Sequence, residues 1–468
     1  MAGVRTSRRE FLVSALGGAA GIALETSSFE ARRARAIERR AAPHFAASSG
    51  PPPATPIRQA GSLPFPRLRA GTDSLPQVDH IVVLMLENHS FDNVLGMLGR
   101  GDGFELGGNG LPKAANPDGE GRLVRAFPMP TPCQLPHQPS QTWNASHRQY
   151  DGGRMDGFVE SASGPVAMGY WTSRDLPFTY GLARTFPIAD RYFCSVLAQT
   201  YPNRRFLISA TAYGLVDDTV GGAVPPNGTI FTSLDRYGIT WKNYYSSVPT
   251  SYLYPSLIAK TDVQRSIVPI EEFFADTAKG TLPGFSLIDP NFDSNSEENP
   301  QDIQFGEVFL ARVVTALMSG PKWPKTMFVW TYDEHGGYYD HVPPPPAVAP
   351  DVVPPAISVP PDLPGGYDRY GFRVPAGLVS PLAKPDYVSH VSYDHTSVLK
   401  LVETKWNLPA LTRRDANAHD LLDMVDLRAK PRFLHPPLLP APVNPALRAS
   451  CQLKGAGTIP PRGVVVGA

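Results

Sequence analysis

Long apolar runs that stop abruptly are the main pattern along this chain. One run covers residues 78–86 and is rich in β-branched side chains, and a second covers residues 326–332. Continuous apolar runs of this length are typical of strands buried in parallel sheets. A capping serine and helical spacing over residues 90–96 follow the first run, so the pattern predicts a strand–loop–helix unit there. An amphipathic pattern near residues 305–317 predicts a longer helix.

Both apolar runs are followed by oxygen-bearing side chains. Glu87 and Asn88 end the first run, and Asp333 and Glu334 end the second. A single acid at such a place is more often a helix cap or part of a surface ion pair. Parallel strands, however, bring two pairs together at their carboxyl ends, where buried acids need a cation or a partner. Three carboxylates and one amide suit a hard or borderline divalent cation and phosphate chemistry. The sequence therefore predicts one metal ion at these four residues.

Irregular segments separate and follow the two predicted strands. Residues 100–185 show no sustained period, and a proline-rich loop covers residues 343–361. These patterns predict an α/β domain with a mostly parallel central sheet and a smaller irregular subdomain. The domain is placed at residues 76–430, before a C-terminal tail at residues 431–468.

Thr200 is the predicted nucleophile. It lies in the segment 197–206, where Pro202 is well placed to open a helix. A hydroxyl at a helix N-terminus lies near free N–H groups and the positive end of the dipole, which favour an alkoxide and an incoming phosphate. Contact with the metal would lower the hydroxyl pKa further, so Thr200 is also counted among the metal ligands. The alternative for Thr200 is simple helix capping, and Arg204 is either a phosphate clamp or a surface arginine.

Several of the 11 histidines lie near these segments. A phosphodiester enzyme needs a general acid that protonates the leaving alkoxide, and histidine suits that role near pH 7. The candidates are His137, His341 and His395. Each of them can equally be structural, and the sequence does not choose among them.

The N-terminus resembles a twin-arginine export signal. Residues 7–12 read Ser-Arg-Arg-Glu-Phe-Leu and precede a short stretch rich in alanine and glycine. This arrangement predicts export by the twin-arginine translocase to the periplasm, the cell envelope or the medium, whereas the alternative is a disordered basic tail. The signal region is placed at residues 1–40 and a proline-rich linker at residues 41–75.

Charge and composition exclude several classes of protein. Lys and Arg together number 43, as do Asp and Glu, so the net charge gives no steering toward nucleic acid and no nucleic-acid partner is expected. The apolar stretch near the N-terminus is too short to span a bilayer, and no later window is long and charge-free enough, which excludes a polytopic membrane protein. The mature protein is expected to be soluble or in peripheral contact with a membrane. Three cysteines are too few for a disulfide scaffold and lack the spacing of a zinc cluster.

Four segments, taken together, look like the bacterial phospholipase C and acid phosphatase family, within the alkaline-phosphatase-like superfamily. The likeness extends over about residues 76–428, and the order and spacing of the segments both fit. They read Glu-Asn-His-Ser-Phe-Asp-Asn at 87–93, Asn-Ala-Ser-His through Asp-Gly-Phe at 144–158, Thr-Tyr-Pro-Asn-Arg at 200–204, and Tyr-Asp-Glu-His-Gly-Gly-Tyr-Tyr-Asp-His-Val at 332–342.

The resemblance implies a three-layer α/β/α sandwich and a metal-dependent phosphoesterase. It places the nucleophile at Thr200 and the metal ligands at both strand ends, in agreement with the residues themselves. It also implies nearby histidines, which match His137, His395 and His341. One departure lies at residues 298–303, Glu-Asn-Pro-Gln-Asp-Ile, where a histidine is expected before the Asp-Ile segment.

The function expected from the residues and the resemblance is that of an exported phospholipase C. Such an enzyme hydrolyses the phosphodiester of phosphatidylcholine-type lipids to diacylglycerol and phosphocholine, here through a phosphothreonine intermediate. The nearest alternative is an acid phosphatase that acts on phosphate monoesters with the same metal site. A third is an exported metal- or lipid-binding protein without activity. Choline recognition would use an aromatic cage, for which Trp143, Tyr150, Trp171 and Tyr201 are available, although each is equally a packing residue.

Overall fold

The chain divides into two units, residues 1–56 and residues 57–468. The computed structural model describes residues 56–134, 139–259, 261–444, 461 and 463–466. The fold and the site therefore concern the second unit. The predicted signal region at residues 1–40 lies outside the described residues.

An eight-stranded sheet forms the centre of the second unit. Within this sheet β11 runs antiparallel to both of its neighbours, and the other pairings are parallel. The mostly parallel sheet predicted from the sequence is thus confirmed. In spatial order the strands are β12 (Val388–Ser389), β6 (Ile188–Ala189), β11 (Ala376–Val379), β10 (Thr326–Tyr332), β1 (His80–Leu86), β9 (Phe285–Asp289), β7 (Trp241–Tyr245) and β8 (Ile267–Pro269).

The two predicted strands are β1 and β10, and they are neighbours at the centre of the sheet. They pair in parallel over their whole length, from His80 opposite Thr326 to Leu86 opposite Tyr332. Every residue of both strands is buried, which explains why the two runs are continuously apolar rather than alternating. Because the register is in step to the last residue, the segments that follow the two strands begin side by side.

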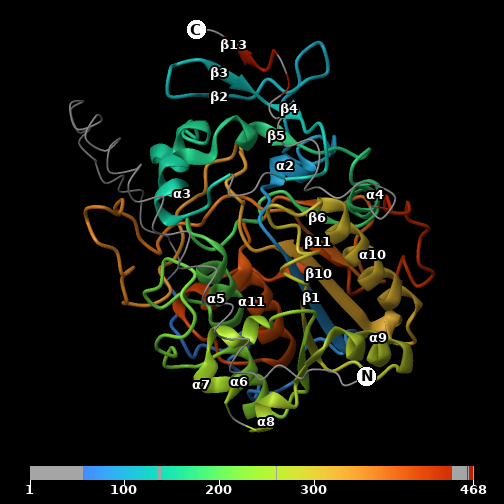
Figure 1. Ribbon diagram of the computed structural model, residues 1–468. Coiled ribbons are helices and arrows are strands. Elements are labelled where there is room, and N and C mark those ends of the chain that lie inside the picture. Colours follow the sequence, from blue (N-terminus) through green and yellow to red (C-terminus); the bar gives the residue numbers. More distant parts are fainter. Residues whose placement is uncertain (1–55, 135–138, 260, 445–460, 462, 467–468) are drawn as a thin grey trace, which may run out of the picture. The chain divides into compact units, whose positions relative to one another are not determined.

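Helices cover both faces of this sheet, as Figure 1 shows. The helices α9 (Ile270–Lys279) and α10 (Ile303–Ser319) pack together on one face, and α5 (Thr200–Ser209) and α11 (His395–Trp406) pack together on the other. The amphipathic helix predicted near 305–317 is confirmed as α10, which begins where the Asp302 side chain accepts a hydrogen bond from the Gln304 N–H. The result is the layered α/β arrangement that was expected.

Shorter elements build the irregular part and the connections. A three-stranded sheet is formed by β13 (Val465–Val466), β3 (Leu123–Arg125) and β2 (Ala115–Pro117), and β4 (Phe127–Pro128) pairs with β5 (Gly169–Tyr170). The other α-helices are α2 (Phe91–Leu95), α3 (Trp143–Tyr150), α4 (Pro177–Thr185), α6 (Ile230–Arg236), α7 (Pro255–Ile258), α8 (Thr261–Gln264) and α12 (Arg413–Ala416).

Part of the predicted linker packs on the domain instead of standing apart from it. Asn407, at the end of α11, accepts a hydrogen bond from the Phe65 N–H at 2.9 Å and donates one to the Phe65 carbonyl at 3.1 Å. Leu75 is buried in the core. The second unit begins at residue 57.

The helices and cysteines of the described part of the chain add two observations. None of its helices combines the length and apolar character needed to cross a membrane. Cys133 is disulfide-bonded, whereas Cys194 is a free, buried thiol whose pKa is raised well above the ordinary value by burial.

Candidate active site

The two strand tips bring the four predicted metal ligands together. The Asn88 backbone N–H donates to Asp333 Oδ1 at 3.3 Å, and Glu87, Asn88, Asp333 and Glu334 are all buried. Asn88 adopts a left-handed conformation with φ of 69°. This turn aims its side chain back toward the end of β10 instead of continuing the strand.

Gly336 makes this close approach possible. It has φ of +66°, and a Cβ at this position would lie 1.9 Å from the carbonyl oxygen of Asn88. Its N–H donates to Glu334 Oε2 at 2.7 Å. A side chain at Gly336 would therefore push the two strand tips apart.

The Asn88 side chain is the clearest sign of a cation at this site. The end of its amide that faces the acids lies 2.9 Å from Asp333 Oδ1 and 2.9 Å from Glu334 Oε1. If that end is the nitrogen, it donates two hydrogen bonds. If it is the oxygen, three oxygens converge without a proton between them, which is the arrangement that binds a hard cation. The residues present thus fit a divalent ion held by oxygen.

Thr200 joins these residues from the other side of the sheet edge. It is the first residue of α5, and its Oγ1 lies 3.3 Å from the end of the Asn88 amide that faces the acids, to which it donates when that end is Oδ1. The N-cap position belongs to Gln199, whose side chain makes no capping hydrogen bond. The hydroxyl of Thr200 is therefore directed at the strand tips and does not cap the helix.

Arg204 lies one turn further along α5 and holds the acids in place. Its side chain is 2% exposed and forms ion pairs with Asp333 at 3.0 Å, Glu87 at 3.4 Å and Asp289 at 3.4 Å. Since its Nε and both terminal nitrogens are occupied by these carboxylates, Arg204 is neither a surface residue nor a free phosphate clamp.

The acids carry more negative charge than Arg204 can balance. Burial raises the pKa of Glu87 and of Glu334 well above the ordinary range, and neighbouring carboxyl groups raise both further. Burial also raises the pKa of Asp333, although Arg204 opposes this shift. In addition, Glu87 Oε2 is buried without a hydrogen-bond partner. A bound cation would remove each of these penalties.

Three acids around the site were not found by sequence reasoning. Asp289 ends β9, the strand next to β1, so the same signal of an apolar run ending in an acid could have found it. Asp218 accepts hydrogen bonds from the Tyr201 N–H at 2.8 Å and from the Gln199 side chain at 2.9 Å, on either side of Thr200 in the chain. Glu298 contacts Glu87. Asp218 and Glu298 lie in loops, where no pattern in the neighbouring sequence marks them as site residues.

Asp218 occupies one of the N–H groups at the start of α5. The α5 N-terminus was predicted to offer free N–H groups to a phosphate. The Tyr201 N–H is already occupied by Asp218, and the next residue, Pro202, has none. Stabilisation of an anion by this helix therefore depends on the dipole and on Thr200 itself.

The predicted histidines have different surroundings. His395 is fully buried at the start of α11, with Nε2 donating to the Asp333 carbonyl at 2.6 Å and Nδ1 3.4 Å from the Tyr192 hydroxyl. Burial lowers the pKa of its ring to about 4, so this geometry supports the Asp333 backbone and leaves no nitrogen for a substrate. His137 lies outside the described residues.

His341 belongs to a second charged cluster. Although burial lowers its pKa, the hydrogen bond and charge of Asp92 raise it to about 9. Asp92, Asp340 and His341 have ligand atoms within 4.8 Å of one another. Arg373, fully buried, pairs with Asp92 at 3.2 Å and Asp340 at 2.9 Å, so an arginine already neutralises these carboxylates. The strand tips, with their unpaired oxygens, remain the better candidate for a metal.

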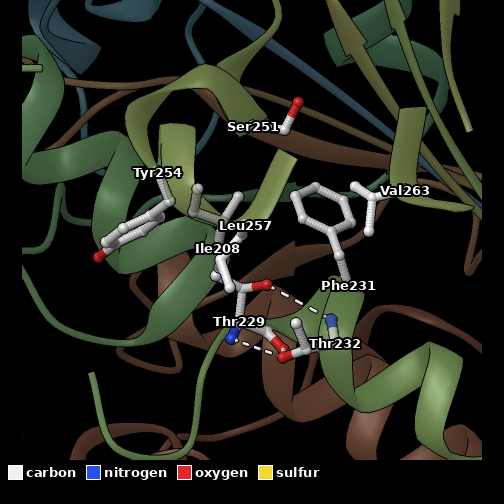
Figure 2. Close-up of a pocket in the computed structure, with 8 residues that line it drawn as sticks. All are labelled: Ile208, Thr229, Phe231, Thr232, Ser251, Tyr254, Leu257 and Val263. Carbon is white, nitrogen blue, oxygen red and sulfur yellow. Dashed lines mark hydrogen bonds between the residues drawn. The ribbon is translucent and has the colours of Figure 1, made fainter. Parts of the chain in front are cut away.

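A small and mostly apolar pocket lies away from this chemistry. It is lined by Ile208, Thr229, Phe231, Thr232, Ser251, Tyr254, Leu257 and Val263, and Figure 2 shows Thr229 and Thr232 hydrogen-bonded to each other on its wall. Ile208 lies about 12 Å along α5 from Thr200. None of the predicted site residues lines this pocket.

Among the aromatic candidates for a choline cage, Tyr201 alone adjoins Thr200. Trp143 and Trp171 are buried, and their indole nitrogens donate to main-chain carbonyls at 2.9 and 3.2 Å. Tyr150 packs under the guanidinium of Arg369 at 4.8 Å. Trp143 and Trp171 are therefore packing residues.

Comparison with known proteins identifies the family. The model of the phosphoesterase family matches residues 78–409, which include both strand tips, Thr200 and Arg204. The chain belongs to the phosphoesterase family. As a phosphoesterase, it is a phosphoric ester hydrolase.

Relatives of this phosphoesterase include phospholipases C. It is 31% identical to phospholipase C B of Mycobacterium tuberculosis over 79% of this chain and 83% of that protein. It is 30% identical to non-specific phospholipase C1 of Arabidopsis thaliana over 77% of this chain and 73% of that one. A solved structure of a protein in the alkaline phosphatase superfamily from Vibrio parahaemolyticus covers 77% of this chain and 74% of its own, at 10% identity and a TM-score of 0.36.

Proposed function

We propose that this phosphoesterase is an exported phospholipase C that cleaves phosphatidylcholine-type lipids through a phosphothreonine at Thr200. The observation that carries the proposal is the Thr200 hydroxyl, which starts α5 and points at Asn88 between the two acidic strand tips. The relatives named phospholipase C support the choice of a phosphodiester substrate.

The chain's own residues divide the work of such a reaction. Glu87, Asn88, Asp333 and Glu334 would hold one divalent cation, which when bound supplies charge stabilisation at the phosphoryl oxygens. Thr200 loses its hydroxyl proton and attacks phosphorus in line, and the bond from phosphorus to the diacylglycerol oxygen breaks while that oxygen takes up a proton. Water then cleaves the phosphothreonine, which releases phosphocholine and returns a proton to Thr200. Arg204 opposes the rise in the pKa of Glu87 and Asp333 and holds both carboxylates in place.

The proton donor to the leaving group is the part of the mechanism that histidine is predicted to supply. His395 is occupied at both ring nitrogens, so its proposed part is to fix the Asp333 main chain. His341 lies in the Arg373 cluster with Asp92. His137 and His341 stay candidates for the general acid.

Substitution of Thr200 tests the nucleophile. Thr200→Val keeps the shape of the side chain without the hydroxyl and should lower kcat at least about 1000-fold, whereas Thr200→Ser should retain measurable turnover. Acid quenching of wild type during turnover, followed by peptide mass spectrometry, should find phosphate on Thr200. A Thr200→Val enzyme with near wild-type turnover would exclude this nucleophile.

Two chromogenic substrates test the substrate class. A phospholipase C should hydrolyse p-nitrophenylphosphorylcholine with a higher kcat/KM than p-nitrophenyl phosphate, because the diester retains the head group. The reverse order would favour the acid phosphatase that the same metal site could serve.

Export is a separate part of the proposal. The Ser-Arg-Arg-Glu-Phe-Leu motif at residues 7–12 supports recognition by the twin-arginine translocase. Replacing both Arg8 and Arg9 by lysine should leave the protein in the cytoplasm of an expressing cell. Unchanged secretion of this variant in a fractionation assay would contradict the proposed route.

A further inference from the structure

A loop carrying Glu298 is fixed against the end of β1. The Glu87 N–H donates to the Ser296 carbonyl at 2.8 Å, which ties the loop directly to the strand tip. Gln301 closes the loop, because its side-chain oxygen accepts hydrogen bonds from the backbone N–H groups of Ser296 at 2.9 Å and Glu297 at 3.1 Å. The backbone N–H of Gln301 donates to the Glu298 carbonyl at 2.8 Å. The position of Glu298 is therefore set by the fold before any ligand binds.

The Glu298 side chain meets Glu87, which lacks a hydrogen-bond donor. Glu87 Oε1 faces Arg204 at 3.4 Å, but Glu87 Oε2 is buried without a hydrogen-bond partner. The carboxyl group of Glu298 makes a side-chain contact with Glu87. Two carboxyl groups in contact repel each other unless a proton or a cation lies between them.

The local charges favour a cation at this contact. Arg204 is the positive side chain that acts on Glu298, and its guanidinium is already shared among Glu87, Asp289 and Asp333. Glu298 itself is partly exposed. Glu298 lies in the segment 298–303, where the resemblance leads one to expect a histidine, and it supplies an oxygen ligand there.

We infer that Glu298 is a further ligand of the divalent cation proposed at Glu87, Asn88, Asp333 and Glu334. The inference rests on the proposed metal site and extends it to four carboxylates and one amide. A donor set made of oxygen alone suits ions such as Mn²⁺ or Ca²⁺, which carboxylate and carbonyl groups bind well.

Direct measurement of Mn²⁺ binding tests this assignment. The full chain, stripped with a chelator, is titrated with MnCl₂ while the free ion is followed by electron paramagnetic resonance. Glu298→Gln should raise the Kd roughly 10-fold or more, the size of effect found when the support of a metal site is removed. Glu271→Gln removes an equal charge from an exposed position on α9 and should leave the Kd unchanged.

Stability without metal distinguishes a ligand from a structural residue. Because Glu298→Gln relieves a contact between like charges, the metal-free variant should melt at the same temperature as wild type or higher, and Mn²⁺ should raise its melting temperature less. A metal-free variant that melts well below wild type would overturn the assignment, since Glu298 would then serve the fold.

The Glu87→Gln variant separates this inference from the proposed function. If wild type binds Mn²⁺, Glu87→Gln does not, and Glu298→Gln binds as wild type does, then Glu298 is not a ligand and the proposed site stands. If wild type and Glu87→Gln bind Mn²⁺ equally, the strand-tip site itself is wrong, and the role of Glu298 falls with it.

Discussion

Arg204 offers the sharpest test of how the site is held together. The substitution Arg204→Met keeps a long apolar side chain in α5 but removes the guanidinium that pairs with Glu87, Asp289 and Asp333. Three carboxylates, each at most 3% exposed, then lose the same partner. They must either stay ionised without compensation or take up protons.

The size of this effect follows from burial. Breaking a buried ion pair by removing one partner costs about 3–5 kcal/mol, because the remaining charge is left without solvent or counterion. Asp289 keeps hydrogen bonds from Asn243 and Thr250, which limits its share of the loss. Arg204→Met is therefore expected to lower the free energy of unfolding by about 4 kcal/mol, a large part of the 5–15 kcal/mol typical of a folded domain.

Urea unfolding of the metal-free protein measures this loss. The matched control is Arg122→Met, since Arg122 is 47% exposed and pairs with Asp118 at 2.8 Å on the surface, where such a pair contributes about 0–1 kcal/mol. The reasoning fails if Arg204→Met destabilises the protein by no more than the control. That result would mean that the acids at the strand tips are protonated or hydrated and do not depend on Arg204.

Three further outcomes are expected. His341 has its pKa raised to about 9 in the folded protein, so the stability it contributes is complete below pH 6.5 and is lost as the pH rises through 9. The difference in unfolding free energy between wild type and His341→Gln should therefore shrink by about 3 kcal/mol from pH 6 to pH 10. A constant difference would contradict the ion pair with Asp92. Gly336→Ala should lower both the melting temperature and kcat, because the added Cβ meets the Asn88 carbonyl, and a variant that behaves as wild type in both assays would argue against close contact of the strand tips. Cys194 should not react with a thiol reagent until the protein unfolds, and rapid labelling of the native protein would show that this thiol is accessible.

The central strands were predictable because their signal is local. The runs 78–86 and 326–332 are mostly apolar because β1 and β10 are covered on both faces, and the acids stand out at their ends. Thr200 was recognised from its place at the start of a helix and from its segment. For these residues, the local sequence pattern predicts the environment that the structure has.

The remaining features depend on contacts between distant segments. Asp218 reaches the start of α5 because Arg205 binds the carbonyls of Thr219 and Gly221 at 3.0 and 2.8 Å. No sequence pattern near residue 218 predicts this contact. The environment of His341 likewise depends on Arg373, which lies just before β11. Burial of Arg204 could not be seen in the sequence, because an arginine is ordinarily a surface residue.

The pairing of β1 with β10 also determines when the enzyme can first act. Asn88 and Asp333 are 245 residues apart in the chain. At a synthesis rate of about 5–20 residues per second, roughly 12 to 50 seconds pass on the ribosome between the synthesis of Asn88 and that of Asp333. Thr200 is made 112 residues after Asn88. In the rest of that interval the nascent chain contains Thr200 without Asp333 and Glu334, so the arrangement of the strand tips around its hydroxyl is complete only after β10 has been synthesised.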